Sequence, residues 1–237
     1  MARAPDQESV AELVRALEED ILFGRLRPRE RLIEDELISR FGATRHVVRQ
    51  TLVELENMGI VVRIAKRGAQ VRDFTRDEVE QICAVREMLH AHAASLIPLP
   101  ADPGLISRLK KIHEAHSLEV KRQNLWAIHQ RNNEFHEVLF AACGNPYLVK
   151  TIQEYARMSL AFRCHLMSNP MRAARARGQH ARMIDALKRG DRAELIRLCV
   201  EHTQPSKQVY MMMQGWIEPG RGDGNAAAPA APSRRLA

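Results

Sequence analysis

The sequence predicts a mainly α-helical protein with one small β-hairpin in its N-terminal third. Apolar residues recur at spacings of three and four along most of the chain, as expected for helices that bury one face. The exception lies between residues 60 and 72, where β-branched residues flank the turn-like sequence Ala65-Lys66-Arg67-Gly68. From Arg76 to about Trp216 only the helical pattern remains, so we expect an antiparallel all-helical bundle there.

Three predicted helices precede the hairpin. Ser9 and Glu12 match the capping box that starts a helix, and the apolar spacing continues from there to Gly24. A second helix fits Glu34–Phe41 and a third fits Arg45–Met58. Strands are expected at residues 60–64 and 69–72. Because three helices followed by a basic hairpin is the order of a winged helix-turn-helix, residues 8–73 are predicted to form this DNA-binding unit.

The third helix carries the residues that could read DNA. Thr44 is a candidate N-cap of this helix. Arg45 and Arg49 lie one helical turn apart at its N-terminal end, which would enter the major groove. An arginine can pair bidentately with guanine. Further candidate contacts to bases, backbone or minor groove are His46, Gln50, Lys66, Arg67 and Gly68.

The charge distribution agrees with a polyanionic partner. The net charge is +7, and the segment from residue 45 to residue 72 contains six basic and two acidic residues. A net charge of this kind also fits a nonspecific DNA-binding protein, which would bind every duplex with similar affinity. That alternative leaves the long helical part without a purpose.

Residues 17–71 resemble the winged-helix domain of the GntR family. The matching positions are Ile21, Gly24, Leu26, Pro28, Leu32, Glu34, Leu37, Thr44, Arg45, Val48, Arg49, Leu52, Gly68 and Val71. The resemblance implies that Arg45 and Arg49 are the principal contacts to a double-stranded DNA operator, supported by the wing. Three positions depart from the family pattern, with Arg29 for glycine, Val47 for proline and Gln50-Thr51 for Glu-Ala, so Arg29 and Gln50 could add operator contacts.

The C-terminal part is predicted to contain six helices. Thr75 with Glu78, and Asp191 with Glu194, match capping boxes. The expected breaks lie at residues 98–103, near residue 124, and at residues 144–146, 169–170 and 190–191. The segment 218–237 is rich in Gly, Pro and Ala, and we expect a disordered tail there.

Four polar residues of this part could hold a divalent cation. Asn132 and His136 share one helix face at i and i+4, and His180 and His202 each lie within a later predicted helix. Three imidazoles and an oxygen are donors that suit a zinc-like ion inside a bundle. The alternative is a metal-free pocket in which the histidines bind an anionic ligand directly.

Residues 75–208 are similar to the ligand-binding FCD-type domain of the FadR subfamily of GntR regulators. The sequences Asn132-Asn133-Glu134-Phe135-His136 and Gly144-Asn145-Pro146-Tyr147-Leu148 stand where the family shows Asp-x-x-Phe-His and Gly-Asn-Pro-x-Leu. The resemblance implies that residues 75–216 bind a ligand and dimerise, and that an Asp and three His hold a metal approached by a small organic acid. Because Asn132 replaces the Asp, metal binding is expected to be weaker.

Arg86 occupies the position of an arginine in the family's first sensing helix, where the resemblance implies that it can pair with an effector carboxylate. The alternative is a solvated arginine on the surface. His90 replaces the family's glutamate, so Arg86 lacks its usual partner. Arg163 is a further effector-binding candidate. The resemblance implies a homodimeric regulator, most often a repressor released by a metabolite.

A metal-dependent hydrolase is a second hypothesis for the histidine set. It needs a general base, but Asn132 cannot act as one, and Glu134 and Glu137 are expected to point to other helix faces. We therefore predict a protein that is not an enzyme.

The remaining composition favours a cytoplasmic protein. No run of about 18 apolar residues could span a bilayer, and the polar start at residues 1–9 lacks the apolar core of a signal peptide. Cys83, Cys143, Cys164 and Cys199 lie far apart, and we expect reduced, mostly buried thiols.

Overall fold

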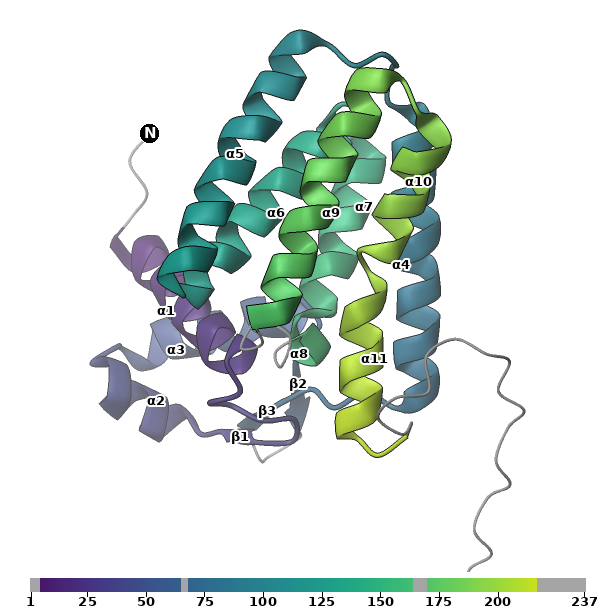
Figure 1. Ribbon diagram of the computed structural model, residues 1–237. Helices are drawn as coiled ribbons and strands as arrows, with labels where there is room; N and C mark the ends of the chain where they lie inside the picture. Colours follow the sequence, from purple (N-terminus) through teal and green to yellow (C-terminus); the bar gives the residue numbers. More distant parts are fainter. Residues whose placement is uncertain (1–4, 65–67, 164–169, 217–237) are drawn as a thin grey trace, which may run out of the picture.

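The computed structural model describes residues 5–64, 68–163 and 170–216, and it confirms a mainly α-helical fold with one small sheet (Figure 1). The predicted tail at residues 218–237 and the candidate wing contacts Lys66 and Arg67 lie outside the described residues. In chain order the elements are α1 (Pro5–Leu22), β1 (Arg31–Leu32), α2 (Glu34–Phe41), α3 (Arg45–Asn57), β2 (Val61–Ile64), β3 (Gly68–Val71), α4 (Arg76–Leu96), α5 (Pro103–Arg122), α6 (Leu125–Ala141), α7 (Pro146–Met158), α8 (Leu160–Arg163), α9 (Pro170–Arg189), α10 (Arg192–Glu201) and α11 (Gln204–Met213).

Helices α2 and α3 form as the sequence predicts. Gly42 ends α2 in the left-handed conformation, with φ of 61°. The Thr44 hydroxyl caps α3 by accepting a hydrogen bond from the Val47 backbone N–H at 3.3 Å. The apolar face of α3 is buried, with Val48 and Leu52 at 0% and 1% exposure, so the opposite face is left to solvent.

Helix α1 differs from the prediction at its start. It already includes Pro5, so Ser9 lies inside the helix and the predicted capping box with Glu12 is wrong. Proline suits a first helical turn because its missing N–H would have no intrahelical partner there. The apolar positions Leu13, Leu17 and Ile21 are buried as the spacing indicated.

The sheet contains a strand that the sequence did not reveal. Strand β3 pairs antiparallel with β2, as predicted for a hairpin, and also with β1, which gives the order β1-β3-β2. Two residues are too few to show the alternating pattern of a strand. The pairing of Leu32 with Ala69 ties the segment before α2 to the wing.

The C-terminal part of the described chain has eight helices, α4 to α11, where six were predicted. The two unpredicted breaks lie between α7 and α8 and between α10 and α11. Pro205 occupies the first turn of α11, and proline cannot continue a helix because it lacks the N–H. His202 is therefore the C-cap of α10. The prediction that it lies within a helix is wrong.

One hydrophobic cluster joins the winged part to the bundle. Leu17 of α1 and Leu52 of α3 belong to the same cluster as Ile82 of α4, Phe162 of α8 and Tyr210 of α11. Helix α1 packs on α8 as well as on α3. The rings of Phe74 and Phe162 meet edge to face at 5.4 Å between centroids. The two parts therefore share buried contacts.

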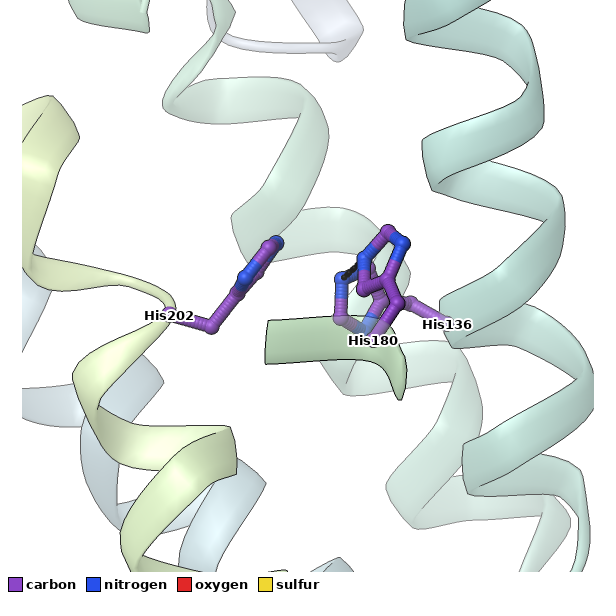
Figure 2. Close-up of side chains that lie close together, drawn as sticks. All are labelled: His136, His180 and His202. Carbon is purple, nitrogen blue, oxygen red and sulfur yellow. Dashed lines mark hydrogen bonds between the residues drawn. The ribbon is translucent and has the colours of Figure 1, made fainter. Parts of the chain in front are cut away.

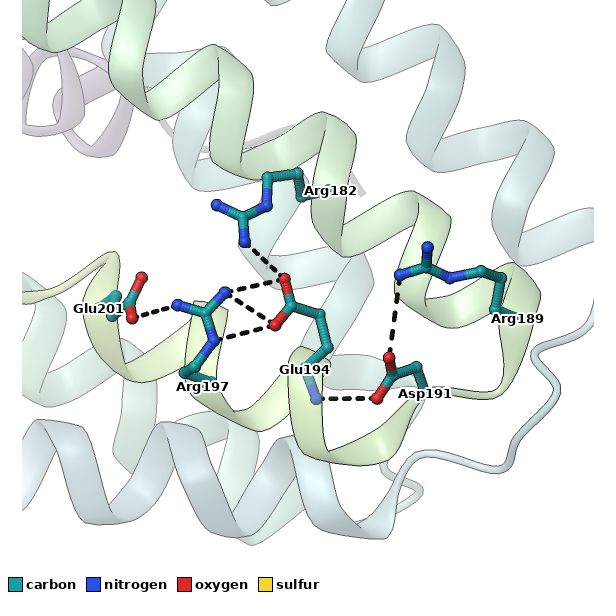
Figure 3. Close-up of polar contacts among 6 residues, drawn as sticks. All are labelled: Arg182, Arg189, Asp191, Glu194, Arg197 and Glu201. Carbon is teal, nitrogen blue, oxygen red and sulfur yellow. Dashed lines mark hydrogen bonds and ion pairs between the residues drawn. The ribbon is translucent and has the colours of Figure 1, made fainter.

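A charged network holds α9 against α10 (Figure 3). The Asp191 carboxylate caps α10 by accepting from the Glu194 backbone N–H at 3.0 Å. Glu194 accepts from Arg182 of α9 at 2.7 Å and also pairs with Arg197. His180 lies on α9 and His202 directly follows α10, so this network links the two helices that position these histidines.

None of the described helices combines the length and apolar character needed to cross a membrane. Cys83, Cys143 and Cys199 are buried free thiols, as predicted, whereas Cys164 lies outside the described residues.

Candidate functional site

The start of α3 presents the side chains that the sequence singled out. Arg45, His46, Arg49 and Gln50 are all exposed, and Thr44 precedes them as the N-cap. An exposed N-terminal turn on the second helix of a helix-turn-helix is the arrangement that reaches base edges in the major groove.

Acidic residues of α2 hold the two arginines in this structure. Arg45 lies 2.6 Å from the Asp35 carboxylate, and Arg49 donates from Nε to the Glu34 carboxylate at 3.0 Å. Both arginine side chains remain more than half exposed, at 54% and 57%. Exposed pairs of this kind contribute only about 0–1 kcal/mol, so a phosphate or a guanine can replace them at little cost.

Arg29 and Gly68 occupy special backbone conformations beside the sheet. Arg29 has φ of 67°, a conformation that favours glycine, and its Nε donates to Asp73 at 2.6 Å. Gly68 has φ of 85°, and a Cβ there would lie 3.3 Å from the Leu32 carbonyl oxygen. The ion pair with Asp73 accounts for Arg29 within the fold, although its side chain is 78% exposed.

Three histidines from separate segments converge inside the bundle (Figure 2). His136 comes from α6, His180 from α9 and His202 from the end of α10. One ring nitrogen from each lies within 4.8 Å of the other two, and Nε2 of His180 lies 3.4 Å from Nε2 of His136. Figure 2 shows the rings facing one another across a short gap.

Asn132 and Gln179 contact opposite sides of the His202 ring. The Gln179 side-chain oxygen lies 2.9 Å from Nδ1, and the Asn132 oxygen lies 3.3 Å from Nε2. A neutral imidazole carries one N–H, so it donates to only one of these oxygens. With the proton on Nδ1, the Nε2 lone pair and the Asn132 oxygen face each other as two acceptors. A cation between them would satisfy both, so the donor set fits a metal ion.

Burial favours the neutral form of the other two rings. It is the largest cause that lowers the pKa of His136 and of His180 well below 6.5, and neighbouring histidines lower both further. Neutral imidazole is the form that coordinates metals. The buried Nδ1 atoms of both rings have no hydrogen-bond partner among the described residues.

A cavity of about 580 Å³ opens beside the histidines, and Arg86 and His90 of α4 are among the residues that line it. Arg86 is 5% exposed, and its Nε and Nη1 atoms have no hydrogen-bond partner among the described residues. Burial lowers the pKa of Arg86, yet a guanidinium stays charged in proteins. A buried cation without an ion-pair partner among the described residues is suited to receive an anion.

Several features of the cavity were not predicted. Gln179 beside His202 was missed because a glutamine without a motif gives no signal in one sequence. His116 lines the cavity, and burial lowers its pKa to about 4. Glu137 is also among the lining residues of the cavity, but its carboxylate is not part of the cluster formed by the three histidines, and Glu134 pairs with Arg131. The side chain of Arg163 lies outside the described residues.

The winged fold and the exposed arginines of α3 are those of a DNA-binding regulator, and its helical part contains a cavity. Comparison with family models agrees. Residues 9–71 match the model of the bacterial regulatory proteins of the gntR family, and residues 81–204 match that of the FCD domain. The chain belongs to the GntR family of transcriptional regulators, in the group with an FCD domain, and it is not an enzyme.

Individual proteins show the same relationship. The uncharacterized HTH-type transcriptional regulator BphR of Paraburkholderia xenovorans is 29% identical over 55% of this chain and 56% of its own length. The HTH-type transcriptional repressor GlaR of Escherichia coli is 26% identical over 63% of this chain and 70% of its own length. The solved structure of E. coli McbR/YncC shares the fold, with a TM-score of 0.74, 18% identity, and coverage of 90% and 100% of the two chains.

Proposed function

We propose that this GntR regulator is a homodimeric repressor that leaves its operator when a small organic acid binds in the helical cavity. The observation that carries the proposal is Arg86, a buried guanidinium in the cavity wall without an ion-pair partner among the described residues. An unpaired buried charge destabilises a protein, so its presence in a cavity indicates a ligand that neutralises it.

A carboxylate suits Arg86 because the planar guanidinium can donate two parallel hydrogen bonds to it. His90 lies in the same wall, one turn further along α4, and can contribute a further hydrogen bond to the acid. The repressor GlaR is a relative of this chain, which supports repression as the mode of action.

Asn132, His136, His180 and His202 would hold a divalent, zinc-like cation. When bound, this ion would supply a positive centre for the acid in addition to Arg86. Because Asn132 is neutral, these residues do not offset the charge of the ion, which favours an anionic ligand to complete the site. In the metal-free alternative, Arg86 and the histidines bind the acid without an ion.

The DNA contacts in this proposal come from α3 and the wing. Arg45 and Arg49 read bases, with His46 and Gln50 beside them, and Thr44, Gly68 and the basic hairpin approach the phosphate backbone. Arg29 adds a backbone contact if DNA replaces Asp73 as its partner. Helix-turn-helix dimers bind two half-sites, which is the reason for proposing a homodimer. The match to a family of bacterial regulatory proteins supports the cytoplasmic location that the sequence predicts.

A thermal-shift screen with Arg86→Met tests the proposal. The wild-type chain and the variant are melted with a panel of small carboxylic acids, with added zinc, with added manganese, and after chelation. Methionine keeps the apolar length of the side chain and removes the buried charge, so we expect the variant to melt at an equal or higher temperature without ligand. An acid that stabilises the wild-type chain should no longer stabilise the variant.

Arg108→Met is the matched control, because Arg108 is an exposed residue of α5 that does not line the cavity. It should keep the full response to the acid. A response that requires metal supports the histidine site, and a response that survives chelation supports the metal-free alternative. If no acid stabilises the wild-type chain, or if Arg86→Met responds fully, the proposal is wrong.

A further inference from the structure

One carboxylate links the two arginines that would read DNA. The same oxygen of Glu34, Oε2, accepts from Nε of Arg49 at 3.0 Å and from Nη1 of Arg45 at 3.3 Å. Arg45 and Arg49 lie one turn apart on α3, where two like charges repel each other. The shared carboxylate offsets this repulsion and fixes one nitrogen of each guanidinium group.

Glu34 is itself held in place by the fold. It is the first residue of α2, and β1 ends two residues earlier at Leu32, which pairs with Ala69 of the wing. Its side chain is only 25% exposed, compared with 75% for the neighbouring Asp35. Glu34 also lines a groove between α3 and the wing, together with Arg49 and residues of both strands of the hairpin. The Glu34 carboxylate therefore has less freedom to move than that of Asp35.

The hydrogen bonds with Glu34 leave the arginines able to contact bases. A guanidinium carries five N–H groups, and Glu34 accepts only from the Nε of Arg49. The two terminal nitrogens of Arg49 can still face the two acceptors on the major-groove edge of guanine. Arg45 also pairs with Asp35, which is the more exposed carboxylate and the one that DNA can displace more readily.

We propose that Glu34 is a positioning residue for operator recognition, which sets the directions of Arg45 and Arg49 and thereby increases discrimination between the operator and other duplexes. This inference rests on the proposed function, in which the two arginines read bases. Ordering a long side chain at an interface costs free energy, and a side chain that is already ordered in the free protein avoids that cost. Because a carboxylate repels phosphate, Glu34 contributes to specificity and not to general affinity for DNA.

Glu34→Ala and Glu36→Ala are a matched pair of variants. Glu36 lies in the same first turn of α2, is exposed, and forms no ion pair with Arg45 or Arg49 among the described residues. Each variant removes one negative charge from the same helix. An operator is first selected from random duplexes with the wild-type chain. The affinity of each protein is then measured for this operator and for random duplex at one salt concentration.

The ratio of operator affinity to random-duplex affinity should fall only in Glu34→Ala. We expect this ratio to be roughly threefold to tenfold lower than in Glu36→Ala, because the arginines must now be ordered when DNA binds. On random duplex both variants should bind at least as tightly as the wild type, since each has lost a charge that repels phosphate. Retained binding there also shows that Glu34→Ala is folded.

Equal ratios in Glu34→Ala and Glu36→Ala would overturn the inference and leave the proposed function standing. A higher ratio in Glu34→Ala would also overturn it, because Glu34 would then only compete with DNA for the arginines. If the wild-type chain selects no operator at all, the proposed function fails and the inference fails with it.

The same substitution in an Arg49→Ala chain tests whether Glu34 acts through the arginines. Glu34→Ala should cost less operator affinity in that chain than in the wild type, because one of the two side chains that Glu34 holds is already absent. Equal losses in the two chains would show that Glu34 acts independently of Arg49, and would overturn the inference.

Discussion

Tyr210 donates its hydroxyl to the Asp73 carboxylate at 3.0 Å, across 137 positions of sequence. The other oxygen of Asp73 accepts from Arg29 at 2.6 Å. Asp73 therefore connects the segment before α2 to α11, at the point where the wing leads into α4. Because Asp73 lies two residues after β3, this contact links α11 to the end of the wing hairpin.

Tyr210→Phe should destabilise the protein. Hydrogen bonds to charged groups contribute about 1.5–3 kcal/mol, and we expect a loss near the lower end because Asp73 keeps Arg29. Urea denaturation measures the change. Tyr147→Phe is the control, since Tyr147 is 82% exposed, and its effect should stay within about 0.5 kcal/mol. Equal stabilities of the two variants would show that the Asp73 contact contributes nothing.

The contribution of Tyr210 should also depend on alkaline pH. Burial is the main cause that raises the pKa of Tyr210 from 10 to about 12, and Asp73 raises it further. The folded chain therefore keeps this proton after the unfolded chain has lost it, so the stabilisation is complete below pH 10 and declines as the pH rises toward 12. The difference in unfolding free energy between wild type and Tyr210→Phe should shrink over that window. A constant difference would contradict the assignment.

Thr75→Ala should weaken the junction between the wing and α4. The Thr75 hydroxyl accepts from the Glu78 backbone N–H at 3.2 Å, and the Glu78 carboxylate accepts from the Thr75 backbone N–H at 2.9 Å. Loss of such a cap costs about 1 kcal/mol. Chemical denaturation should show this loss for alanine and little change for Thr75→Ser, which keeps the hydroxyl. The prediction fails if serine and alanine are equally destabilising.

Arg49→Ala should separate DNA reading from folding. Among the described residues the arginine pairs only with Glu34, on an exposed surface, so the melting temperature should barely change. Loss of a bidentate guanine contact costs about 1–3 kcal/mol, or roughly fivefold to 150-fold in affinity for a selected operator. Arg108→Ala on α5 should bind as the wild type does. An equal loss on random duplex would instead assign Arg49 to the phosphate backbone.

Asn132→Asp should increase affinity for zinc or manganese. The Asn132 oxygen already lies 3.3 Å from Nε2 of His202, and a carboxylate there would offset part of the charge of the ion. Titration calorimetry with the metal alone should give tighter binding for Asn132→Asp and weaker binding for His202→Ala. If all three proteins bind metal equally, then the ion does not bind at these residues.

The sequence alone determined the features that depend on neighbouring residues. The bounds of α2, the Thr44 cap and the exposed positions of Arg45 and Arg49 follow from helix spacing and from Gly42. The Thr75 and Asp191 caps were likewise visible as motifs. Such signals are local, because a cap or an amphipathic face is specified within a few positions.

Other features were decided by tertiary structure. The pairing of β1 with β3 stabilises a strand too short to show a pattern, and the break before α11 places His202 at a helix end. Gln179 contacts His202 and Glu137 lines the cavity only because separate helices pack in one particular way. The sequence alone could not decide whether Arg86 is exposed or buried. Arg86 has no ion-pair partner among the described residues, and the cavity reaches Leu22, because of how distant helices pack together, which no local pattern specifies.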